Sequence, residues 1–143
     1  MIRPVNSAKR PFLRMEAGAA INAGQVLVIS SGEAVPAAGG ASAATVVGVA
    51  VEDAASGALV YIYPPDQEFE FDIYQGGAVD VGALANQGEI YDIYVDGAAG
   101  DGSKEGEMYL DLNDTSGAIV VLSAYDNIRR VATGSFTIAS RYL

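Results

Sequence analysis

The stretch AGQVLVISSGEAVPA, residues 23–37, decides the fold class. Two apolar runs flank the dipeptide Ser31-Gly32. A Ser-Gly pair between apolar runs is a turn signal, so the stretch predicts a β-hairpin. None of its side chains carries catalytic chemistry, so this hairpin is expected to be a piece of scaffold.

Further short strands follow along the chain. The segment TVVGVAVED, residues 45–53, is predicted to be a strand in which Gly48 marks a bulge or a close backbone approach. AASG, residues 54–57, is predicted to be a turn before the strand of residues 58–64. In residues 67–74, QEFEFDIY, acidic and apolar side chains alternate, which predicts one acidic and one apolar strand face.

The C-terminal half continues the pattern. Residues 107–114 and 118–126 are predicted to pair with each other across Thr115-Ser116-Gly117, and a last strand is expected at Ser135–Ala139. No run of ten or more residues has helical periodicity. The sequence therefore predicts an all-β fold, a small β-sandwich or a partly open β-barrel.

Three parts are expected along the 143 residues. Residues 1–16, basic and proline-containing, are predicted to be an extended N-terminal arm. Residues 17–126 are predicted to form the β-domain, and residues 127–143 a C-terminal strand or tail. One domain of this length buries a core without metals or disulfides.

Charge is distributed unevenly. The net charge is −10, yet residues 1–14 and 129–143 contain only basic charged residues. All 18 acidic residues and Lys104 lie between these ends. An acidic body repels phosphate, so nucleic acid is not expected as a partner. No apolar run reaches the roughly 18 residues of a membrane span, and no secretory signal is expected.

The composition of the chain gives little support for an enzyme. The chain has no His and no Cys, which excludes a Ser-His-Asp triad, thiol catalysis and cysteine metal sites. Adjacent or alternating carboxylates fit solvated strand faces better than a glycosidase pair. We therefore expect no enzyme activity, no cofactor and no metal site. Two weaker alternatives are a Ca²⁺ site and an aromatic stacking surface. Their residues would be Asp96, Asp101, Glu105 and Glu107 for the ion, and Tyr61, Tyr63, Tyr91 and Tyr94 for stacking, although packing is the commoner role of strand tyrosines.

A family resemblance is carried by residues 17–64. The pieces AGxxINAGQVLVI, GEAVPA and VVGVAVEDAASGALVYIY, in this order, resemble the β-domain of tailed-phage head decoration proteins, also called capsid cement or auxiliary proteins. The resemblance implies a β-tulip-like domain and a non-enzymatic virion protein, made in the host cytoplasm, on the outer capsid surface. It also implies homotrimers at three-fold or quasi-three-fold positions that bridge capsomers and stabilise the expanded head.

The expected partners are the major capsid protein and neighbouring copies of the chain. Cations interspersed with apolar side chains at both ends suit docking onto a protein surface. The predicted contact residues are Arg3, Lys9, Arg10, Phe12, Leu13, Arg14, Arg129, Arg130, Arg141 and Tyr142. Two alternatives stay open: another virion component, such as a minor capsid, head-fibre or tail-tube protein, and a carbohydrate-binding β-module.

Overall fold

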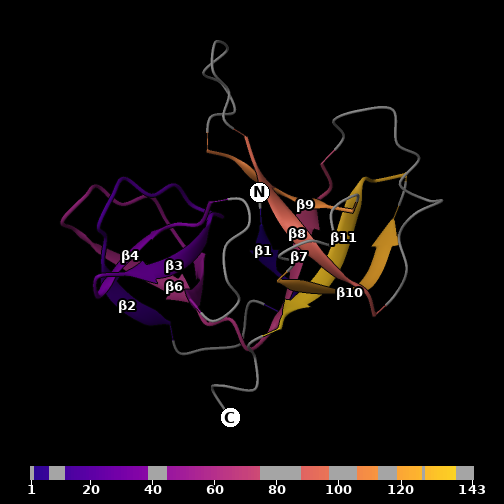
Figure 1. Ribbon diagram of the computed structural model, residues 1–143, viewed down its shortest axis with the longest axis horizontal. Helices are drawn as coiled ribbons and strands as arrows, with labels where there is room; N and C mark the ends of the chain where they lie inside the picture. Colours follow the sequence, from indigo (N-terminus) through magenta and orange to yellow (C-terminus); the bar gives the residue numbers. More distant parts are fainter. Residues whose placement is uncertain are drawn as a thin grey trace.

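The fold consists of two antiparallel β-sheets that lie side by side (Figure 1). The computed structural model describes residues 2–6, 12–38, 45–74, 88–96, 106–112, 119–126 and 128–137. No α-helix occurs among these residues, and one of the two sheets is curled into a half-barrel. The predicted all-β class, a small sandwich or partly open barrel, is thus confirmed.

The larger sheet has six strands in the order β1-β7-β11-β10-β8-β9. Strands that are distant in sequence are neighbours in it: β7 lies between β1, from the N-terminal end of the chain, and β11, the last strand. The strand bounds are β1 Arg3–Pro4, β7 Glu68–Asp72, β8 Ile90–Val95, β9 Met108–Asp111, β10 Val120–Asp126 and β11 Val131–Phe136.

The smaller sheet has five strands in the order β2-β6-β5-β3-β4. An isolated bridge joins Ala17 to Ala34, and the Gly18 amide donates to the Ala34 carbonyl at 2.8 Å. The end of β2 thereby approaches β4, and the sheet curls into its half-barrel. The strand bounds are β2 Leu13–Glu16, β3 Val26–Ser30, β4 Glu33–Pro36, β5 Val46–Ala50 and β6 Leu59–Tyr63.

The predicted hairpin of residues 23–37 is present as β3 and β4. Ser30 pairs with Glu33, which leaves Ser31 and Gly32 as a two-residue turn. Both residues have positive φ, 52° for Ser31 and 81° for Gly32. Positive φ at both positions defines a type I′ turn, whose twist matches that of the two strands.

Gly48 meets both predictions made for it. The pairing of β3 with β5 shifts register beside Leu27 and Gly48, and the φ of Gly48 is 141°. A Cβ atom at this position would lie 2.0 Å from the backbone oxygen of Tyr63. Only glycine fits, and the bulge bends the sheet where it has to curl.

Two hydrophobic clusters fill the molecule. The first joins the two sheets: Val26 and Val49 of the smaller sheet belong to the same buried cluster as Phe69, Phe71 and Phe136 of the larger one. The three phenylalanine rings meet edge to face, with centroids 5.5–6.5 Å apart. The second cluster lies inside the curled sheet and contains only aliphatic side chains, among its buried members Ala17, Ile21, Leu27, Ala34, Val47, Ala50, Val60 and Ile62.

The alternation predicted for residues 67–74 is confirmed in β7. Phe69 and Phe71 are fully buried, whereas Glu68 is exposed and Glu70 and Asp72 are half-buried. The apolar face of β7 therefore builds the first cluster, and its acidic face remains on the surface.

One pairing prediction and one strand boundary predicted for the C-terminal half were wrong. Strands β9 and β10 do not pair with each other, because β8 lies between them and pairs with both. The last strand begins at Val131 rather than Ser135, and it lies inside the sheet between β10 and β7. Alternation identifies a strand but not its partner, and Ala132 and Gly134 weaken the strand signal of β11.

The N-terminal segment contributes a strand to each sheet. Within the predicted arm, Arg3–Pro4 pairs with β7 and Leu13–Glu16 pairs with β6, each at the end of its sheet. The preceding residue, Ile2, is buried in the first cluster. The described residues of this segment are thus extended as predicted, and they are edge strands. The proposed boundaries at residues 17 and 127 stay predictions.

Candidate functional site

The predicted contact residues divide into three locations. Arg3 lies in β1, Phe12, Leu13 and Arg14 lie at or in β2, and Arg129 and Arg130 lie in the loop between β10 and β11. The remaining four, Lys9, Arg10, Arg141 and Tyr142, lie outside the described residues.

Arg3 points at the acidic face of β7. Its guanidinium forms an ion pair and hydrogen bond with Glu70, and it lies 3.5 Å from an Asp72 carboxylate oxygen. The side chains are partly exposed, so the pair contributes modestly to stability. The charge of Arg3 is therefore engaged within the chain, where it attaches β1 to β7.

A surface with aromatic and cationic side chains covers the outer face of β2 and β6. Cross-strand partners share a sheet face, and Arg14 lies opposite Tyr61. The Phe12 ring contacts Tyr61 and Tyr63 edge to face, with centroids 6.4 and 5.4 Å apart. We name this surface, made by Phe12, Arg14, Leu59 and Tyr61, the N-terminal patch; exposed Glu16, opposite Leu59, adds a carboxylate at its end.

The side chains of the N-terminal patch are exposed. Phe12 is 43% exposed, Tyr61 39% and Leu59 62%, and Arg14 is exposed as well. Leu13, the next residue after Phe12, instead packs against the aliphatic cluster inside the half-barrel. Of the predicted N-terminal residues, Phe12 and Arg14 are therefore presented for a partner and Leu13 is not.

The second location is the β10–β11 loop. The Asp126 carboxylate accepts hydrogen bonds from the backbone amides of Ile128, at 2.9 Å, and Arg129, at 3.0 Å. Arg130 has a φ of 57°, a left-handed conformation that is uncommon for a residue with a side chain. The carbonyl of Arg130 accepts a hydrogen bond from the Ile73 amide at 3.1 Å. These contacts tie residues 128–130 to β10 and to Ile73, while the Ile128 side chain is 95% exposed.

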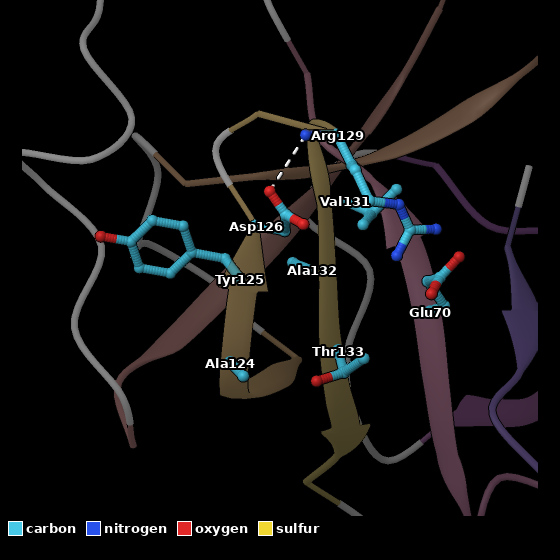
Figure 2. A pocket seen from close by; sticks show the side chains of 8 residues that line it. All are labelled: Glu70, Ala124, Tyr125, Asp126, Arg129, Val131, Ala132 and Thr133. Carbon is cyan, nitrogen blue, oxygen red and sulfur yellow. Dashed lines mark hydrogen bonds between the residues drawn. The ribbon is translucent and has the colours of Figure 1, made fainter.

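A pocket of about 180 Å³ lies beside this loop (Figure 2). Its floor comes from β10 and β11, and the Arg129 guanidinium points across it toward the Glu70 carboxylate. Carboxylates therefore lie at its rim, and small or aliphatic side chains lie at its base. The lining residues are Glu70, Ala124, Tyr125, Asp126, Arg129, Val131, Ala132 and Thr133.

Tyrosines gather at the other end of the larger sheet. Tyr74 and Tyr94 stack with ring centroids 3.7 Å apart, and Tyr109 lies opposite Tyr94 on β9. Burial, together with a hydrogen bond to Glu107, raises the pKa of Tyr109 to about 12. A hydrogen bond with Tyr74 is the main cause that raises the pKa of Tyr94. The raised pKa values keep the Tyr94 and Tyr109 phenols protonated at neutral pH, so neither is a general base there.

The four tyrosines considered for a stacking surface do not form one. Tyr91 is buried in the first cluster and donates its hydroxyl to Glu89 at 2.7 Å. Tyr61 and Tyr63 lie on β6, whereas Tyr94 lies on β8 of the other sheet. Packing, the role expected first, accounts for Tyr91.

The described part of the chain holds neither a cluster of metal ligands nor a membrane-spanning helix. There, no three His, Cys, Asp or Glu side chains gather closely enough to hold a metal ion. Two residues of the suggested Ca²⁺ site, Asp101 and Glu105, lie outside the described residues. Likewise, none of the described segments forms a helix of the length and apolarity needed to cross a membrane.

Sequence reasoning missed Leu59 and Tyr61 as neighbours of Phe12 and Arg14. Alternation within LVYIY does place Leu59 and Tyr61 on one face, but it does not show that β2 pairs with β6. It also missed Ile128, whose only signal is its position between a turn-forming Asp-Asn pair and two arginines.

The two exposed groups of predicted contact residues do not form a single site. The N-terminal patch belongs to the smaller sheet and the β10–β11 loop to the larger, and Figure 1 shows β2 and β11 in separate halves of the molecule. Comparison with known proteins adds no assignment: no protein-family model matches the chain, and a search of the curated proteins finds no match.

Proposed function

We propose that this chain is a virion structural protein that binds the outer surface of a phage capsid and stabilises the expanded head by bridging capsomers. The observation that carries the proposal is the N-terminal patch, an aromatic and cationic surface on an edge strand. Aromatic and arginine side chains are enriched where proteins bind one another. The resemblance of residues 17–64 to head decoration proteins supplies the choice of partner.

Multivalency supports this proposal physically. Each N-terminal patch offers only a few anchors, so a single copy is expected to bind weakly. In a homotrimer, the assembly proposed here, three patches contact the shell together, and the effective concentration of the second and third contacts is high. Modest contacts then hold the protein firmly on the capsid.

The fold determines how the proposal is tested. Deleting residues 1–14 would remove Ile2 from the core, β1 from the larger sheet and half of β2 from the smaller one, so a loss of binding would not separate docking from misfolding. Single substitutions at exposed side chains avoid this problem. Phe12→Ala and Arg14→Glu are the informative variants, and Ile29→Ala is the matched control because Ile29 is 44% exposed on β3.

The experiment is co-sedimentation with expanded and unexpanded empty heads. Wild-type protein and Ile29→Ala are expected to pellet with expanded heads. Phe12→Ala and Arg14→Glu should each weaken binding at least about tenfold, the equivalent of about 1.4 kcal/mol per contact. Wild-type protein that stays in the supernatant with both kinds of head would refute the proposal, and pelleting with purified tails instead would favour the alternative of a tail component.

A further inference from the structure

The β10–β11 loop presents a feature that the N-terminal patch does not explain. Ile128 is 95% exposed, more than any other large hydrophobic side chain among the described residues, the next being Leu59 at 62%. A single exposed aliphatic residue is ordinary on a protein surface. Ile128, however, precedes Arg129 and Arg130, and its backbone amide donates a hydrogen bond to the Asp126 carboxylate.

The backbone conformation of Arg130 is energetically unfavourable. The Asp126 carboxylate fixes the amides of Ile128 and Arg129, and Arg130 is held at a φ of 57°. Glycine or asparagine is the usual residue at such a position, because a side chain is disfavoured there. An arginine that is retained against this preference suggests that its side chain has a use.

A complementary pocket lies a few residues away on the same chain. Its volume of about 180 Å³ equals roughly six waters at about 30 Å³ each, enough space for a branched aliphatic side chain. Ala124 and Val131 line its base, while the carboxylates of Glu70 and Asp126 lie at its rim beside Arg129 (Figure 2). Arg129 points across the pocket of its own chain and Glu70 is paired with Arg3, so the complementary groups are Ile128 with Arg130 on the loop, and the apolar base with Asp126 on the pocket.

We propose that the β10–β11 loop docks onto a second copy of this chain, with Ile128 of each copy entering the pocket of the other around a two-fold axis. A two-fold contact requires one surface to carry both complementary parts, and here Asp126 belongs to the loop and to the pocket alike. Local charge supports this contact, because Arg130 of one copy would lie near the Asp126 carboxylate at the pocket rim of the other and would offset part of the repulsion between two acidic bodies. The contact does not depend on the capsid assignment.

The contact by itself is small. Stable specific interfaces bury about 1,200–2,000 Å² in total, far more than one side chain and one pocket supply. Isolated copies are therefore expected to associate weakly, and the contact strengthens where copies are held close together. A test has to capture a transient complex.

Cysteine cross-linking captures such a complex, because the chain has no cysteine of its own. One sample carries Ile128→Cys and a second carries Ala124→Cys, and the two are mixed and oxidised. A disulfide requires Cα atoms roughly 4.4–6.8 Å apart, so it reports entry of the loop into the pocket. The matched control replaces Ile128→Cys by Ile29→Cys, a cysteine on the exposed face of β3.

The expected result is a mixed disulfide dimer of Ile128→Cys with Ala124→Cys, several-fold above the Ile29→Cys control and reduced at high salt. Adding Arg130→Gly to both proteins separates docking from folding: glycine suits the positive φ and keeps the loop, so stability should not fall while the mixed dimer is lost. A mixed dimer no more abundant than the control, or Ile128→Cys homodimers as the main product, would overturn the proposal. Both readouts use the purified protein alone, so they are separate from capsid binding.

Discussion

The two sheets bury different kinds of side chain. The larger sheet places Phe69, Phe71 and Phe136 at the junction between the sheets, where aromatic rings fill a wide space. The buried interior of the smaller sheet consists of alanine, valine, leucine and isoleucine, with Met15 packed against it. Both sheets bring non-neighbouring strands together, through the Ala17–Ala34 bridge in the smaller sheet and the Ile73–Leu110 bridge in the larger one. The sheets therefore differ in what packs against them: small aliphatic side chains inside the smaller sheet, and aromatic rings at the junction between the two.

Removing one phenylalanine ring tests how much the aromatic junction contributes to stability. Phe71→Ala should lower the free energy of unfolding by about 3–5 kcal/mol, because it leaves a cavity where both sheets meet. Val60→Ala, inside the half-barrel, should cost about 2 kcal/mol. Urea denaturation measures both, and a larger loss for Val60→Ala than for Phe71→Ala would contradict the central role of the aromatic junction.

Adding a side chain at Gly48 tests the close approach of β5 to β6. Gly48→Ala should cost about 2–3 kcal/mol, because its φ of 141° disfavours any side chain and the new Cβ would collide with the Tyr63 carbonyl. Gly32→Ala is the matched control. It also has positive φ, but nothing lies within 4 Å of its Cβ position, so about 1 kcal/mol is expected. Equal losses in thermal or urea unfolding would show that the close approach at Gly48 does not matter.

The smallest effect concerns the far edge of the larger sheet. The pKa of Tyr109 is raised to about 12, above the value of about 10 expected in the unfolded chain. The unfolded state therefore loses this proton first as pH rises, and stability should decline between about pH 10 and pH 12. Tyr109→Phe should flatten that decline and leave stability near pH 8 almost unchanged. Unfolding free energies measured across this range provide the check, and an unaltered slope would mean that Tyr109 does not cause the decline.

The sequence predicted the local features best. The hairpin at Ser31-Gly32, the constraint at Gly48 and the two faces of residues 67–74 each depend on neighbouring residues, and all three are present. Pairing over long distances was not predictable in the same way. Alternation does not reveal that β8 separates β9 from β10, or that β11 is an interior strand.

The candidate site was predictable only in part, for the same reason. Composition singled out Phe12 and Arg14, but their surface is completed by Leu59 and Tyr61, about 45 residues later in the chain. The charge of Arg3, visible in the sequence as part of a basic cluster, is engaged by Glu70 and Asp72 once β1 pairs with β7. Charge counting does not distinguish an exposed cation from one with a partner inside the chain.

The central claim is that the outer face of β2 and β6 contacts the capsid, and side-chain footprinting tests it most directly. Hydroxyl-radical oxidation of Phe12 and Tyr61 would be compared between free protein and protein bound to expanded heads, with Tyr94 of the larger sheet as the internal reference. If the N-terminal patch contacts the capsid, oxidation of Phe12 and Tyr61 falls several-fold on binding while that of Tyr94 changes little. Protection of Tyr94 with Phe12 and Tyr61 still fully reactive would contradict it.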